Sequence, residues 1–216
     1  DHHDRVDSEL LVAAKEHLVG AKQRIGSVRV FQELLGLEGD SGREYFSVFN
    51  QLILQQRNSF IFNGRSRRPP LDFVNAMLSF SYGLIRVSVQ NALECVGLDP
   101  YVGFYHVDRP GRQGLALDMM EELRSYMGER FVLSLINRKQ VDSNDFWVKE
   151  NGAVLFTDDG RKKFLDLWNR RSQETFTHPY MQETISVGLL PYMQAQLMAR
   201  TIRKDLDAYP VFFMDT

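Results

Sequence analysis

The stretch LDFVNAMLSFSYGLIRVSVQNALECV, residues 71–96, is the most hydrophobic part of the chain and predicts its central element. Asp72 is a typical N-cap residue, and Gly97 and Pro100 are typical of a helix end. A helix that is apolar on most of its surface belongs in the middle of a bundle. We therefore expect a multi-helix bundle around this helix, with Cys95 as a buried, inert thiol.

The rest of the chain is also predominantly helical in pattern. Asp7 is a plausible N-cap for one long helix that reaches about Glu33, and Thr157 caps a second that reaches about Arg171. Further helical patterns cover residues 126–139 and 182–206. The only clear hairpin is FWVKENGAVLF, residues 146–156, where Asn-Gly favours a two-residue type I′ turn. The expected fold is mainly α with one small β-hairpin.

Composition excludes several classes of protein. The chain has 216 residues, a formal net charge of −2 and 44% hydrophobic residues, as is usual for a globular protein. A single cysteine excludes an intrachain disulfide and a cysteine-rich zinc site. No run of about 18 apolar residues predicts a membrane span, and no signal-peptide pattern precedes the first helix, so we expect a cytoplasmic protein. Phosphate-loop, dinucleotide-binding, serine-hydrolase and zincin motifs are all missing from the sequence.

The segment 33–56 carries three glycines, Gly36, Gly39 and Gly42, at intervals of three residues. Small residues on neighbouring helical turns permit close approach of another backbone or of a ligand. Glu38 lies among these glycines and beside leucines. Two interpretations stay open for it: a carboxylate that needs a partner in apolar surroundings, or an exposed acid favoured at a helix start.

A histidine and several acids are close together in residues 102–124. His106 precedes a Pro-Gly turn and an amphipathic helix that bears Asp118, Glu121 and Glu122. Positions three and four apart share one face of a helix, so the carboxylates should repel one another unless a cation lies nearby. That cation could be an arginine of the turn or a divalent ion, and nitrogen and oxygen ligands suit Mn²⁺ or Mg²⁺. The alternative is an ordinary solvated acidic face.

Clusters of basic residues interrupt the helices. Arginine on a loop suits phosphate contacts because its planar fork pairs with phosphate oxygens, although a solvated basic loop is the plainer interpretation. We take the following residues as candidates for contact with DNA: Arg65, Arg67, Arg68, Arg109, Arg112, Arg138 and Lys139.

Four stretches, in order, resemble motifs of the CRISPR-associated integrase of spacer acquisition, the first of the Cas proteins, and above all its type I members. They are LLGLEG (34–39), FNGRSRRPPLD (62–72), LDPYVGFYHVDRPGR (98–112) and LALDMMEELR (115–124). FVLSLINRK (131–139) and THPY (177–180) extend the resemblance over nearly the whole chain. Members of the family begin with a small β domain that nothing here matches. The resemblance therefore implies residues 1–32 as a linker and leading helix, followed by the helical catalytic domain in 33–216.

The resemblance also implies a set of site residues. The metal-binding acid of the family's Gly-x-Glu-Gly motif falls on Glu38, the histidine of Gly-Phe-x-His on His106, and the acid of Leu-Asp-x-x-Glu on Glu121. Asp118 is a second carboxylate one turn earlier and is also expected to be catalytic. The implied reaction is metal-dependent, with Mn²⁺ or Mg²⁺: the 3′-hydroxyl of a short foreign DNA, a prespacer, attacks a phosphodiester of the CRISPR repeat.

Expected partners follow from the same resemblance. They are double-stranded DNA, a second copy of the chain in a homodimer, and the second small Cas protein of the adaptation complex, with no membrane involved. The alternative function is a non-catalytic helical module that binds DNA or serves as a scaffold in that complex.

Overall fold

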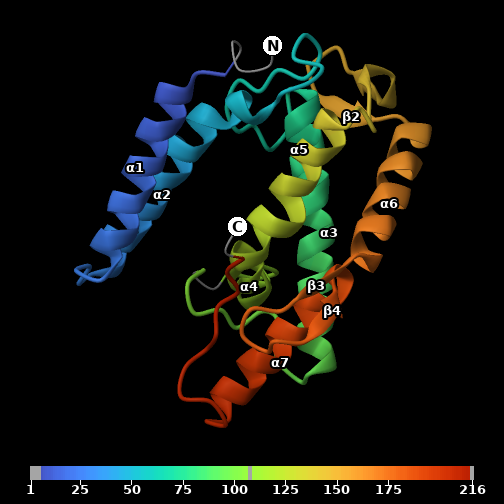
Figure 1. The fold of residues 1–216 in the computed structure, drawn as a ribbon. Helices are drawn as coiled ribbons and strands as arrows, with labels where there is room; N and C mark the ends of the chain where they lie inside the picture. The colour runs from blue at the N-terminus through green and yellow to red at the C-terminus, as the bar shows by residue number, and fades with distance from the viewer. Residues whose placement is uncertain (1–5, 107–108, 215–216) are drawn as a thin grey trace. The chain divides into compact units, whose positions relative to one another are not determined.

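The structure is a computed structural model that describes residues 6–106 and 109–214 and is predominantly helical (Figure 1). The helices are α1 (Ser8–Ile25), α2 (Phe31–Val48), α3 (Phe73–Cys95), α4 (Gly114–Leu123), α5 (Arg130–Asn137), α6 (Asp158–Gln173) and α7 (Leu190–Ile202). Two small sheets pair β1 (Phe146–Val148) with β2 (Val154–Phe156), and β3 (Thr175–Thr177) with β4 (Thr184–Ser186). The predicted mainly α fold is confirmed, with one more strand pair than expected. Among the helices of the described residues, none has both the length and the apolar character needed to cross a bilayer.

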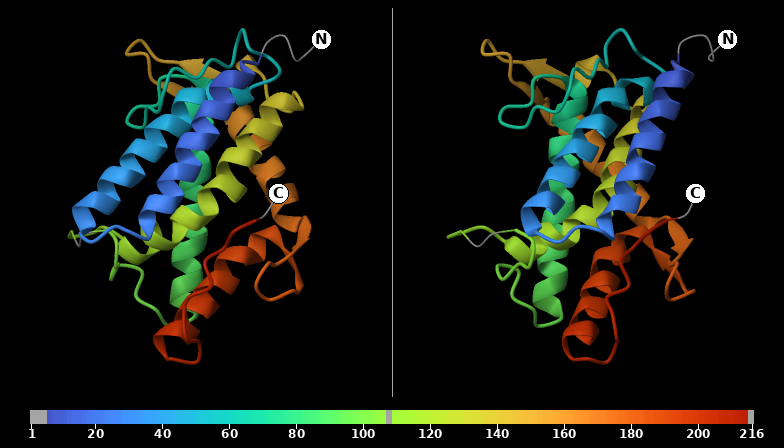
Figure 2. Two further views of the ribbon diagram at one scale, coloured as in Figure 1. Left: turned by 60° about the vertical axis from the view of Figure 1, so that its left-hand side comes forward. Right: turned by 90° about the vertical axis from the view of Figure 1, so that its left-hand side faces the viewer.

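The chain divides into two compact units, and each is described by itself. The first unit comprises Asp1–Ala76 and Leu135–Leu155. In it, α1 and α2 lie side by side and antiparallel (Figures 1 and 2). Nε2 of His17 on α1 lies 2.7 Å from Oδ2 of Asp40 on α2, which joins the pair.

One long N-terminal helix was expected here, and that expectation is wrong. Asp7 does cap α1, because its side chain accepts a hydrogen bond of 3.0 Å from the Leu10 N–H. The helix ends at Gly26, however, and α2 starts a new helix at Phe31. Gly26 is the C-cap of α1, and the chain becomes extended at Val30, the N-cap of α2. No other backbone approaches Gly36, Gly39 or Gly42, because a Cβ atom on any of them would meet nothing within 4 Å among the described residues, and approach of a ligand stays a prediction.

The hairpin is confirmed, but its turn differs from the expected type. Gly152 has φ of +78°, whereas Asn151 is not among the residues of positive φ. The Gly152 N–H donates to the Lys149 carbonyl at 2.9 Å, and the Lys149 N–H donates to the Ala153 carbonyl at 2.9 Å. This pattern is a three-residue loop with a glycine bulge instead of a type I′ turn.

The second unit comprises Met77–Ser134 and Phe156–Thr216, and it holds most of α3. As predicted, Asp72 caps α3, since its Oδ1 accepts from the Asn75 N–H at 2.7 Å. Met77, Leu78, Ile85 and Leu93 of α3 are fully buried. Cys95, at the end of α3, is exposed, which corrects the expectation of a buried thiol.

Two local features of the second unit were not predicted. A π-helical turn, η3 (Arg124–Glu129), connects α4 to α5. The β3–β4 pair is antiparallel, with Phe176 opposite Ile185, and its second strand, β4, occupies residues predicted to begin the last helix. That helix, α7, begins at Leu190 because the preceding segment pairs as a strand and then forms a short 3₁₀ turn, Val187–Leu189.

Candidate active site

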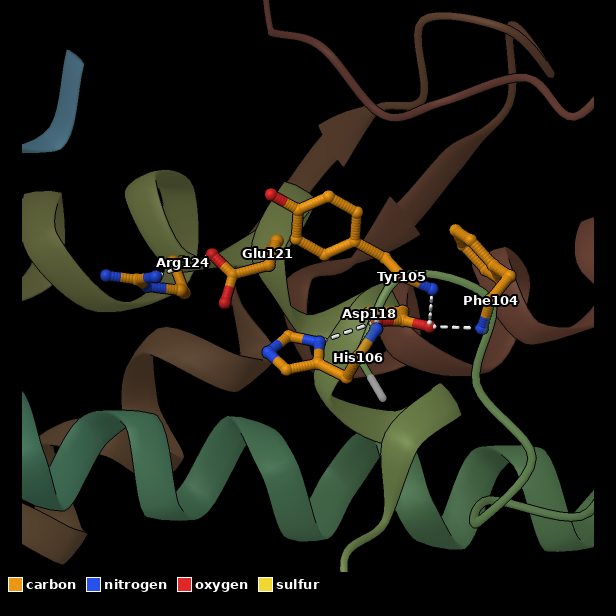
Figure 3. Close-up of polar contacts among 6 residues, drawn as sticks. All are labelled: Phe104, Tyr105, His106, Asp118, Glu121 and Arg124. Carbon is orange, nitrogen blue, oxygen red and sulfur yellow. Dashed lines mark hydrogen bonds and ion pairs between the residues drawn. The ribbon is translucent and has the colours of Figure 1, made fainter. Parts of the chain in front are cut away.

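Asp118 of α4 holds the loop that carries His106. Its Oδ2 accepts hydrogen bonds from the backbone N–H groups of Phe104 at 2.7 Å and Tyr105 at 3.0 Å. Its Oδ1 accepts from the backbone N–H of His106 at 2.9 Å and lies 2.6 Å from Nδ1 of the same residue (Figure 3). One buried carboxylate therefore fixes both the backbone and the ring of the histidine.

The loop reaches Asp118 because two glycines cross. A Cβ atom on Gly103 would lie 2.7 Å from the carbonyl carbon of Gly114, the first residue of α4, and 2.8 Å from Oδ2 of Asp118. A Cβ atom on Gly114 would lie 3.0 Å from the Gly103 nitrogen. Neither position has room for a larger residue. Sequence reasoning did not assign these glycines a role, although Gly103 lies in the quoted motif next to His106.

The charge of Asp118 fixes which nitrogen of His106 carries a proton. Burial would raise the pKa of Asp118, but hydrogen bonds from the Tyr105 N–H, the His106 ring and the other loop N–H groups outweigh burial and lower it. The ionised carboxylate can only accept, so Nδ1 must be the protonated, donating nitrogen. In the neutral ring Nε2 then carries the lone pair, and this nitrogen makes no hydrogen bond to any described residue.

Glu121 lies one turn beyond Asp118 on α4 and pairs with Arg124. Their oxygen and nitrogen atoms are 2.5 Å apart, and the glutamate side chain is 35% exposed against 17% for the arginine. In Figure 3 the Glu121 carboxylate lies on the side toward which the free edge of the His106 ring points. The cation that compensates Glu121 is therefore Arg124, whereas Arg109 and Arg112 of the turn form no ion pair with a described residue.

The π-helical turn places Arg124 against further polar groups. Its guanidinium lies 4.7 Å from the ring centre of Tyr82, whose hydroxyl donates to Oε1 of Glu129 at 2.7 Å. Burial and the charge of Glu129 raise the pKa of Tyr82. Burial alone would lower the pKa of Arg124, but the neighbouring charge of Glu121 raises it above its usual value. Arg124 is thus a permanent cation next to Glu121, a role that its i+3 spacing from Glu121 could have suggested.

Glu122, the third acid of α4, forms hydrogen bonds with residues of α7 and of the C-terminal segment. Its carboxylate accepts hydrogen bonds from the Tyr209 hydroxyl, from the Phe212 N–H at 2.6 Å and from Nε2 of Gln194 at 3.0 Å. Burial raises its pKa despite these bonds. Asp118, Glu121 and Glu122 therefore have three separate sets of partners, which corrects the expectation of one shared acidic cluster.

Glu38 lies in the other unit, exposed in the middle of α2. It is thus neither at a helix start nor in apolar surroundings. Within the described ranges, no three side chains of His, Cys, Asp or Glu gather closely enough to hold a metal ion. A site formed by Glu38, His106 and Glu121 therefore stays a prediction. The donors of the second unit do fit Mn²⁺ or Mg²⁺ chemically, because a metal-binding histidine typically donates its other ring N–H to a carboxylate, as His106 does to Asp118.

The residues predicted to contact DNA differ in their exposure and in their hydrogen bonds within the chain. Nη1 of Arg65 donates to Oδ1 of Asn75 at 2.6 Å and to the Ser66 carbonyl at 2.7 Å, so this side chain supports its own loop. Arg112 is half-buried. The remaining candidates are exposed: Arg67, Arg68, Arg109, Arg138 and Lys139.

Comparison with known proteins identifies close sequence relatives. Residues 1–170 match the family described as "CRISPR associated protein Cas1". The chain is 49% identical over 212 residues to "CRISPR-associated endonuclease Cas1 1" of Chlorobaculum tepidum, covering 98% of this chain and 62% of that protein. It is 53% identical over 180 residues to "CRISPR-associated endonuclease Cas1 2" of Rhodospirillum rubrum, covering 83% and 52%. The chain thus spans between half and two thirds of the length of these two relatives.

Solved structures share the fold. A Cas1 protein from Thermotoga maritima superposes with a TM-score of 0.75 at 26% identity, covering 87% of this chain and 58% of that one. A chain of the "Cas6-RT-Cas1--Cas2 complex" gives a TM-score of 0.83 at 24% identity, covering 96% and 22%. A "Casposase bound to integration product" gives a TM-score of 0.77 at 22% identity, covering 89% and 56%.

Proposed function

Because this chain belongs to the CRISPR-associated Cas1 family, we propose that it carries the strand-cleaving and strand-joining site of a DNA integrase. In the proposed reaction, the 3′-hydroxyl oxygen of a short foreign DNA attacks a phosphorus atom of the CRISPR repeat. One P–O bond forms as another breaks, and the proton of the attacking hydroxyl ends on the leaving 3′-oxygen. The names of the relatives, CRISPR-associated endonucleases, support the class of reaction.

The observation that carries the proposal is the pairing of His106 with Asp118. A buried, ionised carboxylate holds the imidazole by Nδ1 and leaves Nε2 without a hydrogen-bond partner among the described residues. Such an arrangement is common where a histidine binds a metal ion or accepts a proton. A histidine with only a packing role would not need three additional backbone hydrogen bonds to the same carboxylate.

We propose Glu38, His106 and Glu121 as the ligands of Mn²⁺ or Mg²⁺. When bound, the ion supplies Lewis-acid stabilisation of charge on the phosphoryl oxygens. Asp118 acts through His106 and is a positioning residue, which refines its expected catalytic role. Arg124 orients Glu121 through their ion pair.

Exposed arginines and a lysine would bind the DNA backbone: Arg67, Arg68, Arg109, Arg138 and Lys139, with Arg112 contributing from its half-buried position. Arg65 would shape its loop instead of touching DNA. We further propose that the chain forms a homodimer. We also propose a Cas2-type partner, because one structural neighbour is a chain of the Cas6-RT-Cas1--Cas2 complex. The proposed site of action is the cytoplasm.

The test measures metal binding and DNA joining on the same samples. Isothermal titration calorimetry with Mn²⁺ is carried out on the chain, on His106→Ala and on Glu121→Ala, and circular dichroism verifies that each is folded. A labelled duplex with free 3′ ends and a plasmid that contains a CRISPR repeat report strand joining. We expect the two variants to lose both Mn²⁺ binding and joining.

Asp166→Asn is the matched control, because Asp166 is an exposed acid of α6 in the same unit. It should bind Mn²⁺ and join DNA like the unchanged chain. Equal Mn²⁺ binding by all four proteins would contradict the proposed ligands. DNA binding without cleavage or joining, unchanged by either variant, would favour the non-catalytic scaffold.

A further inference from the structure

A pocket of about 210 Å³ lies in the second unit, where the C-terminal end of α3 meets α7. Both ribbon views show these two segments side by side (Figures 1 and 2). The polar lining of the pocket comes from Tyr192, Gln196 and Arg200 of α7, from Arg203 just after α7, and from Cys95 of α3. None of these residues belongs to the site around His106, so the pocket has no role in the proposed chemistry.

The charge of the pocket is positive. Two guanidinium groups line it, and no acidic side chain is among its lining residues within the described chain. Arg200 forms no side-chain hydrogen bond or ion pair with any described residue. Nε of Arg203 lies 3.1 Å from Oδ2 of Asp205, and both side chains are about half exposed. Water screens such a pair, so an incoming anion can compete for the guanidinium.

Neutral groups complete the lining. Nε2 of Gln196 donates to the Tyr192 hydroxyl oxygen at 2.7 Å, which leaves the phenolic proton available to another acceptor. Helix C-termini usually repel anions through their free carbonyl groups. Here one carbonyl near each helix end is engaged: the Leu98 N–H donates to the Leu93 carbonyl at 2.9 Å, and the Asp205 N–H donates to the Arg200 carbonyl at 2.8 Å. The pocket therefore offers guanidinium and phenol donors, and its two arginines offset the negative ends of the helices.

We infer that this pocket binds a backbone phosphate of DNA, as a second anchoring point separate from the His106 site. The inference rests on the proposed function for its ligand. The planar forks of two arginines in a concave site match the geometry of phosphate oxygens. Contact at the end of α7 holds the duplex without reading its sequence, as phosphate contacts do.

Cys95 provides the test, because it is the only cysteine of the chain, is exposed and lines the pocket. The rate of its alkylation by N-ethylmaleimide, a neutral reagent, is measured with and without a short DNA duplex. We expect bound duplex to slow alkylation several-fold in the unchanged chain. The double variant Arg200→Gln/Arg203→Gln should lose this protection. For this double variant, the slope of the logarithm of DNA affinity against the logarithm of salt concentration should be shallower by about 0.9, because one phosphate contact is lost.

Arg161→Gln is the matched control, because Arg161 is an exposed arginine of the same unit that pairs with Asp158. It should keep both the protection and the salt slope. The double variant Arg200→Lys/Arg203→Lys keeps both positive charges and should keep most of the salt slope. A slope that falls only in the glutamine variant therefore reports the loss of charge at the pocket. Glu121→Ala should lose strand joining but keep the protection of Cys95.

Each result decides between defined outcomes. DNA that binds without slowing alkylation in the unchanged chain overturns this inference and leaves the proposed function intact. Protection by inorganic phosphate at matched ionic strength, but not by DNA, would assign the pocket to a free anion and overturn the DNA contact. Protection by polyglutamate alone would assign it to an acidic protein. Absence of any DNA binding overturns the proposed function and this inference together.

Discussion

The backbones of Gly103 and Gly114 pack so closely that neither residue has room for a side chain. This close contact lets the loop that carries His106 reach Asp118. A Cβ atom on Gly103 would lie 2.7 Å from the carbonyl carbon of Gly114. Real side chains do not tolerate such a distance, and a backbone carbon cannot move aside as the tip of a side chain can. Any larger residue at position 103 must therefore push the loop away from α4.

Gly103→Ala should reduce strand joining without abolishing the fold. The added methyl group would lengthen the hydrogen bonds from the loop to Asp118, and overpacking of this kind costs about 1–3 kcal/mol of stability. Thermal unfolding and the joining assay measure the two effects. Gly20→Ala is the control, because a Cβ atom there meets nothing within 4 Å, and it should leave joining unchanged. Unaltered joining by Gly103→Ala would show that the crossing does not position His106.

Asp118→Asn should disorganise His106 more than its small change in size suggests. The carboxylate accepts four hydrogen bonds, whereas an amide offers one accepting oxygen and turns an NH₂ group toward the remaining donors. Loss of a carboxylate that orients a metal-binding histidine typically weakens metal affinity about 10- to 100-fold. Calorimetry with Mn²⁺ measures this, and ¹⁵N chemical shifts of the His106 ring should show loss of the Nδ1-protonated form. An unchanged tautomer would contradict the assigned role.

The sequence was sufficient for the helical class and for the caps. Asp7, Asp72 and Thr157 are helix N-caps as predicted, although the helix after Asp7 is shorter than expected, because short polar side chains at these positions satisfy free N–H groups locally. Helix ends that depend on tertiary pairing were harder. The segment before α7 forms strand β4 because it pairs with β3, and helical periodicity alone does not reveal such a partner.

The candidate site was only partly predictable for the same reason. Spacing placed Asp118, Glu121 and Glu122 on one helix, but each finds its partner through the fold. Asp118 binds a loop that precedes α4, Glu121 binds an arginine of the π-helical turn, and Glu122 binds the C-terminal segment. Local repulsion among the acids suggested a shared cation. The structure instead gives each acid its own hydrogen-bond donors, which no count of charges along the sequence can specify.

Tyr82→Phe should destabilise the second unit and disturb Arg124. The tyrosine hydroxyl donates to Glu129, which is only 5% exposed, so removal of the hydroxyl takes a hydrogen bond from a buried carboxylate. Loss of a partner by a buried acceptor costs about 1–3 kcal/mol. Urea unfolding measures the loss. Tyr180→Phe serves as the control, since Tyr180 is 52% exposed, and it should change stability little. Equal stability of both variants would show that the Glu129 contact contributes nothing.

Glu122 should make stability depend on pH in a direction that its environment fixes. Its folded-state pKa is raised above the ordinary value of 4.5 by burial, so the folded protein holds the proton more tightly than the unfolded chain. The stabilising contribution is therefore complete below pH 4.5 and is lost as the pH rises through the folded-state pKa.

Urea unfolding of the unchanged chain and of Glu122→Gln at several pH values isolates this contribution, because the other titrating groups are common to both proteins. The unfolding free energy of the unchanged chain minus that of Glu122→Gln should decrease from pH 4 toward neutrality. Glu183→Gln, at an exposed position, is the control for the effect of the substitution itself. An increase of that same difference with pH would mean that the hydrogen bonds from Tyr209, Phe212 and Gln194 outweigh burial and hold the carboxylate in its ionised form.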